Sequence, residues 1–167
     1  MAEITKVYRQ DMGARRLICK RYYNSDRVDG HFGAQWDKWH ENGWFDVIKK
    51  QTAEGRAESF EDASAAIGFM REDESGKFEY SIGMFAPKGA AVPEGFQRLD
   101  FENGKIGVCW VYGNEGDVFM KEELCANRLK SEGYDIDDRF CFERYTSRFD
   151  APDEKGNQIL DVCYFLK

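Results

Sequence analysis

An acidic residue, Glu143, stands in the middle of the stretch Phe140–Tyr145, whose bulky and aromatic residues are typical of a β-strand. Because side chains of a strand alternate between its two faces, we expect Cys141, Glu143 and Tyr145 to share one face. A carboxylate among aromatic rings is costly to bury unless something pairs with it. A cationic ligand, or a proton exchanged with a substrate, would compensate for the burial of this charge. The alternative is an ordinary surface acid, solvated or paired across the sheet.

The composition favours a small ligand of a particular charge. The chain has 167 residues, a net charge of −7 and an aromatic content of 15%. This length suits one domain or two small joined modules. Two small cores could not hold all of the aromatic rings, and we therefore expect some of them to line a cleft. The negative charge argues against direct nucleic-acid binding, which needs a basic surface, and favours a neutral or cationic small molecule.

The cysteines and histidines predict no metal site, and we expect no cofactor. The five cysteines are widely spaced and odd in number, which is typical of reduced, buried thiols in a cytoplasmic protein; they are Cys19, Cys109, Cys125, Cys141 and Cys163. His31 and His40 lack a pattern of further ligands around them. We see neither a signal peptide nor an apolar run long enough to cross a membrane.

The first half of the chain reads as strand, helix, strand, strand. After a loose, polar lead-in at 1–14 we expect strands at 15–23, 65–70 and 78–85, helices at 33–43 and 44–50, and a loop or weak helical turn at 51–64. Trp36 and Trp39 are spaced to share one helix face, with Gly43 ending that helix. The two tryptophans either pack on the sheet as core residues or partly face a ligand.

The second half repeats this order after a Pro- and Gly-rich linker at 86–95. We expect a strand pair or bent strand at 96–101 and 105–112 with its turn at Asn103–Gly104, a helix at 118–131 with Asp117 as a possible N-cap and Gly133 at its end, and strands at 140–146 and 158–166. The sequence therefore predicts an α+β fold of two fused strand–helix–strand–strand modules, roughly 15–86 and 96–167. Pseudo-twofold symmetry would place antiparallel sheets around a central ligand cleft.

The order of several short motifs resembles the GyrI-like small-molecule-binding superfamily, which includes effector-binding domains of multidrug-sensing transcription regulators. The motifs are Tyr80–Met84, Val92–Phe96, Gly104–Val108 and Phe142–Tyr145, followed by a closing strand. The resemblance is densest over 65–167 and implies one effector-binding domain over residues 1–167. It also implies that Glu143 meets cationic, lipophilic ligands in the cleft. Regulators of this type carry a DNA-binding module ahead of the effector domain, and 1–14 has no room for one, so we expect a stand-alone domain.

Aromatic residues on several predicted elements complete the candidate ligand site. We expect it to comprise Glu143, Tyr145, Trp110, Tyr112, Tyr80, Trp36, Trp39 and Met84. By alternation, Trp110 and Tyr112 share one face of their strand, and Tyr80 shares a face with Met84. Which strand faces line the cleft stays open at this point.

Three functions compete on this sequence. The first is a binding or sequestering domain for small cationic or lipophilic aromatic molecules. The second, which the resemblance also implies, is a hydrolase of reactive electrophilic compounds, in which Glu143 would be the catalytic acid or base. The third is an interaction with a protein partner, either DNA gyrase as its inhibitor or a separate regulator. We rank binding first and leave enzymatic activity open.

Overall fold

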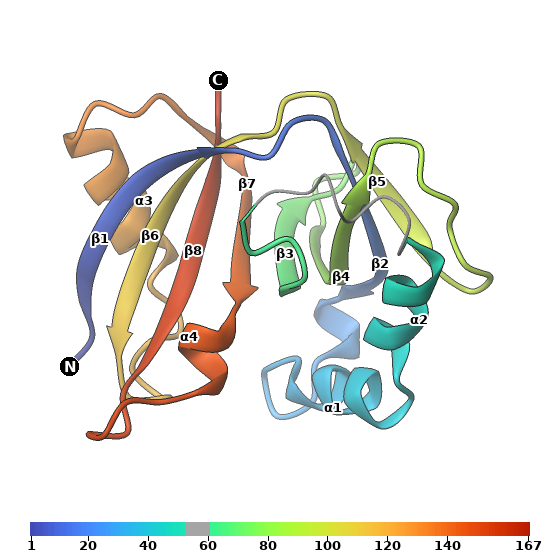
Figure 1. Cartoon of the computed structure of the whole chain (residues 1–167), viewed down its shortest axis with the longest axis horizontal. Coiled ribbons are helices and arrows are strands. Elements are labelled where there is room, and N and C mark those ends of the chain that lie inside the picture. Colours follow the sequence, from blue (N-terminus) through green and yellow to red (C-terminus); the bar gives the residue numbers. More distant parts are fainter. Residues whose placement is uncertain (53–60) are drawn as a thin grey trace. The chain divides into compact units, whose positions relative to one another are not determined.

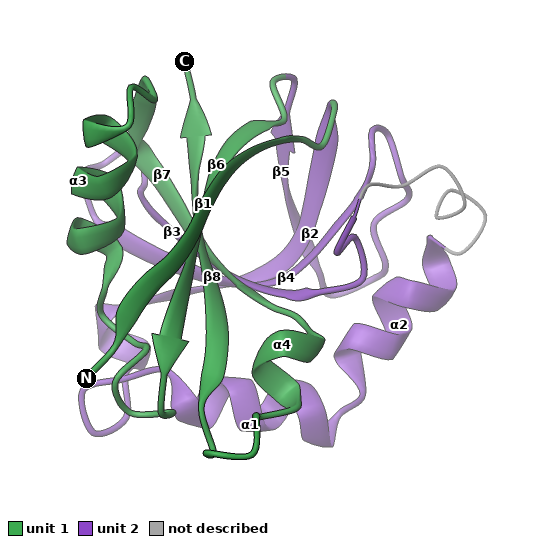
Figure 2. Cartoon of the chain, turned by 60° about the vertical axis from the view of Figure 1, so that its left-hand side comes forward, with its two compact units in different colours: residues 1–13, 103–167 green, residues 14–102 purple. Residues whose placement is uncertain are grey.

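The chain has an α+β fold, seen in a computed structural model that describes residues 1–52 and 61–167. It divides into two compact units, unit 1 with Met1–Gly13 and Asn103–Lys167, and unit 2 with Ala14–Glu102 (Figure 2). The loop or turn expected at 51–64 falls partly outside the described residues. The strands within each unit pair in antiparallel fashion, so the predicted fold class is confirmed.

Unit 1 is a four-stranded sheet in the order β1-β6-β8-β7, with two helices (Figure 1). Its elements are β1 (Glu3–Asp11), β6 (Lys105–Gly113), α3 (Glu122–Ser131), β7 (Ile136–Tyr145), α4 (Ser147–Asp150) and β8 (Gln158–Leu166). The strand β1 lies at the end of this order and pairs with β6.

The helix α3 packs closely on one face of the unit 1 sheet because β6 carries a glycine at the contact. A Cβ atom on Gly107 would lie only 2.9 Å from the Leu129 side chain of α3. On the neighbouring strand the Tyr164 hydroxyl donates a hydrogen bond to the Glu122 carbonyl at 2.9 Å. We call this side of the sheet the helix face of unit 1 and the other side its open face.

Unit 2 is a second four-stranded sheet, in the order β3-β4-β2-β5. Its elements are β2 (Arg15–Tyr23), a 3-10 turn (Asn24–Asp26), α1 (Gly33–Glu41), α2 (Trp44–Gln51), β3 (Ala66–Glu72), β4 (Phe78–Pro87) and β5 (Gln97–Phe101). Trp39 of α1 and Ile48 of α2 are fully buried in one hydrophobic cluster with Ile82 of β4. The two helices therefore cover one sheet face, the helix face of unit 2.

Several sequence-based bounds are confirmed. The strands β2 and β8 span the predicted residues. Gly43 and Gly133 directly follow the C-caps of α1 and α3, with φ of 64° and 92°. Such positive φ values favour glycine, which ends a helix at low cost.

Three local expectations were wrong. The polar stretch at 1–14 is not a loose lead-in, because β1 occupies most of it. The strands β5 and β6 do not pair with each other, since β5 pairs with β2 and β6 pairs with β1 and β8. The helix expected from Val118 begins at Glu122, because Met120 has a left-handed φ of 59° that interrupts the helical path. Asp117 is therefore not its N-cap.

These pairings also change the composition of the two modules that the sequence suggested at 15–86 and 96–167. Unit 1 includes β1 from the start of the chain, and unit 2 extends through β5. None of the helices that the structure describes is long and apolar enough to cross a membrane.

Candidate functional site

Glu143 lies on the helix face of unit 1, with its side chain almost entirely removed from solvent. Its exposed fraction is 7%, and it stands opposite Val162 of β8 in the sheet register. The Tyr145 hydroxyl, two residues along the same face, donates a hydrogen bond to its carboxylate at 3.0 Å. The alternation predicted for Cys141, Glu143 and Tyr145 is therefore confirmed. A carboxylate buried here keeps its charge only where its surroundings compensate for lost water.

Two ionisable neighbours of Glu143 on this face, Cys141 and Tyr164, are neutral at pH 7. Burial raises the pKa of the Cys141 thiol, and burial also raises the pKa of Tyr164. These two residues face each other across β7 and β8. Neither contributes a negative charge, whereas Glu122 of α3 acts electrostatically on both and is a second carboxylate on this face.

Aromatic rings gather around Tyr145, the hydrogen-bond partner of Glu143 at the end of β7. The ring of Phe149, from α4, meets the Tyr145 ring edge to face, with centroids 4.8 Å apart. The Phe119 ring, from the loop before α3, lies 6.0 Å from that of Phe149. We call Tyr145, Phe149 and Phe119 the aromatic wall. A carboxylate attracts an organic cation, and the faces of aromatic rings attract it as well.

Trp110 and Tyr112 share a face as predicted, but it is the open face of unit 1. Trp110 stands opposite Asp161 in the register, and Arg144, which alternates with Glu143, also stands opposite Asp161. The structure therefore does not bring these two aromatic residues together with Glu143. The Tyr112 hydroxyl hydrogen-bonds to the carboxylate of Asp153 instead.

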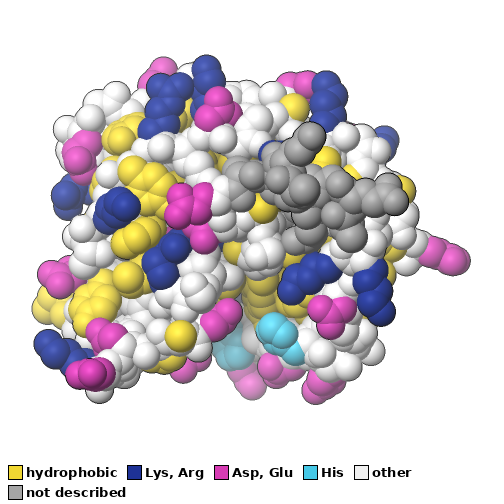
Figure 3. Space-filling view, in the orientation of Figure 1, with side chains coloured by type: hydrophobic (Ala, Val, Ile, Leu, Met, Phe, Trp, Pro, Cys, Tyr) yellow, Lys and Arg dark blue, Asp and Glu magenta, His cyan; other side chains and the backbone are white. Residues whose placement is uncertain are grey.

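Trp110 is part of a cluster of cations and rings on the open face. Its Nε1 donates to the Tyr8 hydroxyl at 3.3 Å, and the Lys6 ammonium and Arg148 guanidinium lie 4.5 and 4.6 Å from its ring centre. Figure 3 shows hydrophobic side chains over β1, β6 and β8 with Lys and Arg side chains among them. These contacts are typical of a well-packed surface layer.

The other predicted site residues belong to unit 2. The Tyr80 ring stacks on Phe32 with centroids 4.5 Å apart, and its hydroxyl accepts a hydrogen bond from Trp36 at 3.0 Å. Trp39 and Met84 are both 0% exposed and pack in the core of this unit. The core interpretation therefore applies to Trp39, and Met84 has the same role, whereas Trp36 stays partly exposed at the edge of the cluster.

Sequence reasoning missed a buried ionic group on the open face of unit 1. Asp161 is 0% exposed, and one of its oxygens accepts hydrogen bonds from Arg144 at 2.9 Å and Arg148 at 2.8 Å. Unit 2 has a similar group, in which Glu79, 1% exposed, accepts from Arg71 at 2.7 Å. Each acid interrupts an otherwise apolar strand, and that signal could have found them.

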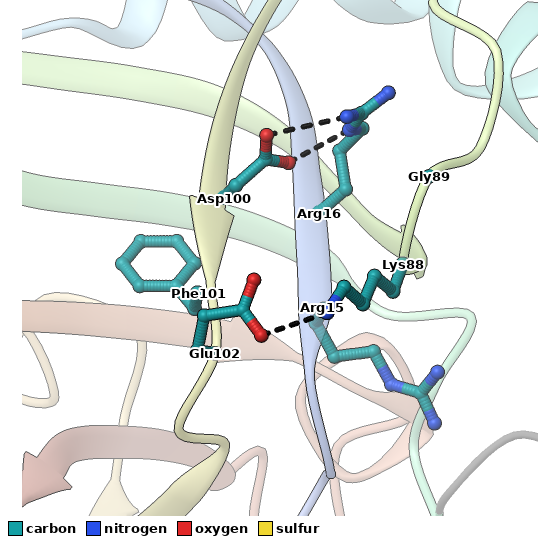
Figure 4. A pocket seen from close by; sticks show the side chains of 7 residues that line it. All are labelled: Arg15, Arg16, Lys88, Gly89, Asp100, Phe101 and Glu102. Carbon is teal, nitrogen blue, oxygen red and sulfur yellow. Dashed lines mark hydrogen bonds and ion pairs between the residues drawn. The ribbon is translucent and has the colours of Figure 1, made fainter.

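A surface pocket of about 110 Å³ lies in unit 2, away from every predicted site residue (Figure 4). The charged side chains that line it form ion pairs with one another: Arg16 pairs with both oxygens of Asp100, and Lys88 pairs with Glu102. It is smaller than the roughly 300–1,000 Å³ of typical small-molecule sites. We therefore keep the Glu143 region as the candidate site.

The described residues contain no cluster of three or more His, Cys, Asp or Glu side chains placed to hold a metal ion. All five cysteines are buried and free of disulfide bonds.

Comparison with known proteins shows the fold through structure alone. No family model matches the chain, and no curated protein sequence matches it. Solved structures do match over nearly the whole chain. SAV2435, in a structure bound to tetraphenylphosphonium, shares 16% identity with a TM-score of 0.66, over 98% of this chain and 94% of that one.

Two further neighbours widen the range of functions found on this fold. A proposed transcription regulation protein of Staphylococcus aureus is 13% identical with a TM-score of 0.61, over 99% of this chain and 98% of that one. A hydrolase from Listeria innocua is 12% identical with a TM-score of 0.55, over 97% of this chain and 92% of that one. These neighbours are consistent with a GyrI-like fold. At sequence identities this low, the similarity is evidence for the fold and not for the function.

Proposed function

We propose that this protein binds small lipophilic organic cations and that Glu143, with Tyr145 beside it, contacts them. The observation that carries the proposal is the Glu143 carboxylate, 7% exposed and next to an aromatic wall. The fold adds support, because a protein that shares it has been seen with a bound phosphonium cation. Ligand binding is thus the function that the local chemistry and the fold favour together.

The physical basis is a charge held in surroundings of low polarity. A cation that enters such a place meets an opposite charge with little water to screen it, so the attraction is stronger than at an open surface. Tyr145 and Phe149 offer aromatic carbon for the apolar part of the ligand, and ring faces attract cations. The net charge of −7 also draws cations toward the protein as a whole.

Hydrolysis of an electrophilic small molecule is the second candidate, because one neighbour is a hydrolase and the Glu143–Tyr145 pair could move a proton. A carboxyl and a phenol joined by a 3.0 Å hydrogen bond are within the reach that general acid–base chemistry needs. Incubation with strained-ring electrophiles, followed by mass spectrometry of products, separates the two functions. Repeated turnover that Glu143→Gln abolishes would favour the enzyme, and recovery of intact ligand would favour binding.

The thiols support a proposal for the cellular location. Five buried cysteines without disulfide bonds suit a reducing compartment, so we propose that the protein works in the cytoplasm. Alkylation of thiols in freshly lysed cells, read by mass spectrometry, would check this. We expect all five to be recovered in reduced form.

The binding proposal is tested by titration of tetraphenylphosphonium into the unsubstituted protein and into Glu143→Gln. The amide keeps the size of the side chain and removes its charge, so we expect affinity to fall by about tenfold or more, equivalent to about 1.4 kcal/mol. Glu115→Gln is the matched control, because Glu115 is an exposed loop residue and its substitution changes the net charge equally. Equal affinities for all three proteins would contradict the proposal.

A further inference from the structure

Two consecutive residues of α4 reach opposite faces of the unit 1 sheet. Arg148 donates to Asp161 on the open face at 2.8 Å. Phe149 packs its ring against Tyr145, whose hydroxyl bonds to Glu143 on the helix face. The short helix α4 directly follows the end of β7 (Figure 1).

The Arg148 end of this link is firmly held. Its partner Asp161 is 0% exposed and is fixed in turn by Arg144 at 2.9 Å. The Arg148 guanidinium also lies 4.6 Å from the Trp110 ring centre. A planar guanidinium that makes an ion pair and an aromatic contact together has little freedom to move.

The helix α4 depends on such anchors because it has only four residues. A single helical turn is not stable by itself in water. Two further bonds hold its backbone: the Thr146 hydroxyl accepts from the Arg148 N–H at 3.2 Å, and the Gln158 amide donates to the Phe149 carbonyl at 2.8 Å. The place of the Phe149 ring is therefore set largely by what holds its neighbours.

We propose that Arg148 and Trp110 are positioning residues for the Glu143 ligand site. From the open face they hold α4, and α4 holds Phe149 against Tyr145, whose hydroxyl meets the Glu143 carboxylate. The inference rests on the proposed function, because it concerns the affinity of that site. It gives Trp110 a different role from the ligand contact expected from sequence: Trp110 acts through Arg148 and does not touch the ligand.

The test compares tetraphenylphosphonium affinity in Arg148→Met, Arg148→Lys and Phe149→Leu. Arg148→Met removes the ion pair but keeps the length of the side chain, so we expect affinity to fall by about tenfold. Phe149→Leu removes the ring contact directly and should give a similar loss without disturbing Asp161. Arg148→Lys keeps the charge but loses the planar fork, and we expect it to recover part of the affinity. Arg139→Met, at a side chain that is 77% exposed, is the control for net charge.

A second readout follows the ring itself. In protein labelled with fluorophenylalanine, the Phe149 resonance is identified by its absence in Phe149→Leu. We expect Arg148→Met and Trp110→Leu to shift and broaden this resonance, and Arg139→Met to leave it unchanged. Circular dichroism confirms that each variant is folded, and the intact Asp161–Arg144 pair favours folding in Arg148→Met.

The outcomes separate this inference from the proposed function. Unchanged affinity in Arg148→Met, with loss in Glu143→Gln, would overturn the positioning role and leave the binding function in place. An unchanged Phe149 resonance in Arg148→Met would also overturn it. If the unsubstituted protein fails to bind lipophilic cations at all, the proposed function falls and the inference with it. Loss in Arg148→Met and Phe149→Leu, with partial recovery in Arg148→Lys, supports it.

Discussion

The two units place a buried acid at the same point of the same strand arrangement. In unit 1, Asp161 of β8 stands opposite Arg144 of β7, and in unit 2, Glu79 of β4 stands opposite Arg71 of β3. The strands involved occupy equivalent places, since β6-β8-β7 and β2-β4-β3 follow the same connectivity. Both acids are 0–1% exposed. An ionic group that recurs in both units is explained by what the units share, their architecture.

One residue before each arginine, the units differ. Glu143 precedes Arg144 in unit 1, and Met70 precedes Arg71 in unit 2. Met70 pairs with Tyr80 in the register and packs on the hydrophobic cluster of the helix face. The equivalent place in unit 1 holds a carboxylate. The comparison therefore relates the repeated acids to stability, and the unrepeated acid, Glu143, is the one to which the proposed function gives a role.

The largest effect that we expect on stability comes from Asp161→Asn. This change leaves the buried Arg144 guanidinium without the charge that compensates it, and breaking a buried ion pair typically costs about 3–5 kcal/mol. The free energy of unfolding from denaturant titration measures it. Asp138→Asn, in an exposed pair with Lys130, is the control and should cost less than about 1 kcal/mol. Similarly small losses of unfolding free energy for both variants would show that Asp161 does not contribute more to stability than an exposed acid.

Glu79→Gln should destabilise unit 2 by a smaller amount. The Arg71 and Arg21 side chains beside it are 19% and 25% exposed, so water can partly replace the lost charge. We expect about 1.5–3 kcal/mol, the range for hydrogen bonds to charged groups. The same denaturant titration applies. If Glu79→Gln left stability unchanged while Asp161→Asn lowered it, the two acids would not be equivalent and the comparison would fail.

Glu143→Met makes unit 1 resemble unit 2 at the position where they differ. Because the change removes the carboxylate that accepts the Tyr145 hydrogen bond, we expect the free energy of unfolding to fall by about 0.5–1.5 kcal/mol, the usual contribution of one hydrogen bond. Binding of tetraphenylphosphonium should be lost in the same protein. Thermal unfolding and titration give both quantities. A loss of several kcal/mol would show that Glu143 is structural, like Asp161.

Local patterns in the sequence predicted much of the fold. Alternation placed Glu143 and Tyr145 on one face, and the glycines at 43 and 133 marked two helix ends, because both features depend on neighbouring residues alone. The bounds of β1 and α3 could not be read in this way. The strand β1 is stabilised by pairing with β6, which lies about a hundred residues later in the chain. The helix α3 begins later than predicted because Met120 has a left-handed backbone conformation.

The candidate site was predicted only in part. Glu143 and Tyr145 are i, i+2 neighbours on one strand, so their proximity follows from strand geometry. Trp110 was grouped with them as an aromatic strand residue, and the sequence left open which face of its strand lines the cleft. The sheet register, which pairs Trp110 with Asp161, places it on the open face. Arg148 was missed because its role depends on a one-turn helix placed by contacts that sequence spacing does not encode.

The most direct test of the account compares a charged ligand with a neutral one. Affinities of tetraphenylphosphonium and of neutral triphenylphosphine oxide are measured by calorimetry for the unsubstituted protein and for Glu143→Gln. If the Glu143 charge carries recognition, the substitution should weaken the cation by about tenfold or more, about 1.4 kcal/mol, and change the neutral ligand by less than about twofold. Equal losses for both ligands, or no loss for either, would contradict the assignment of Glu143 to function.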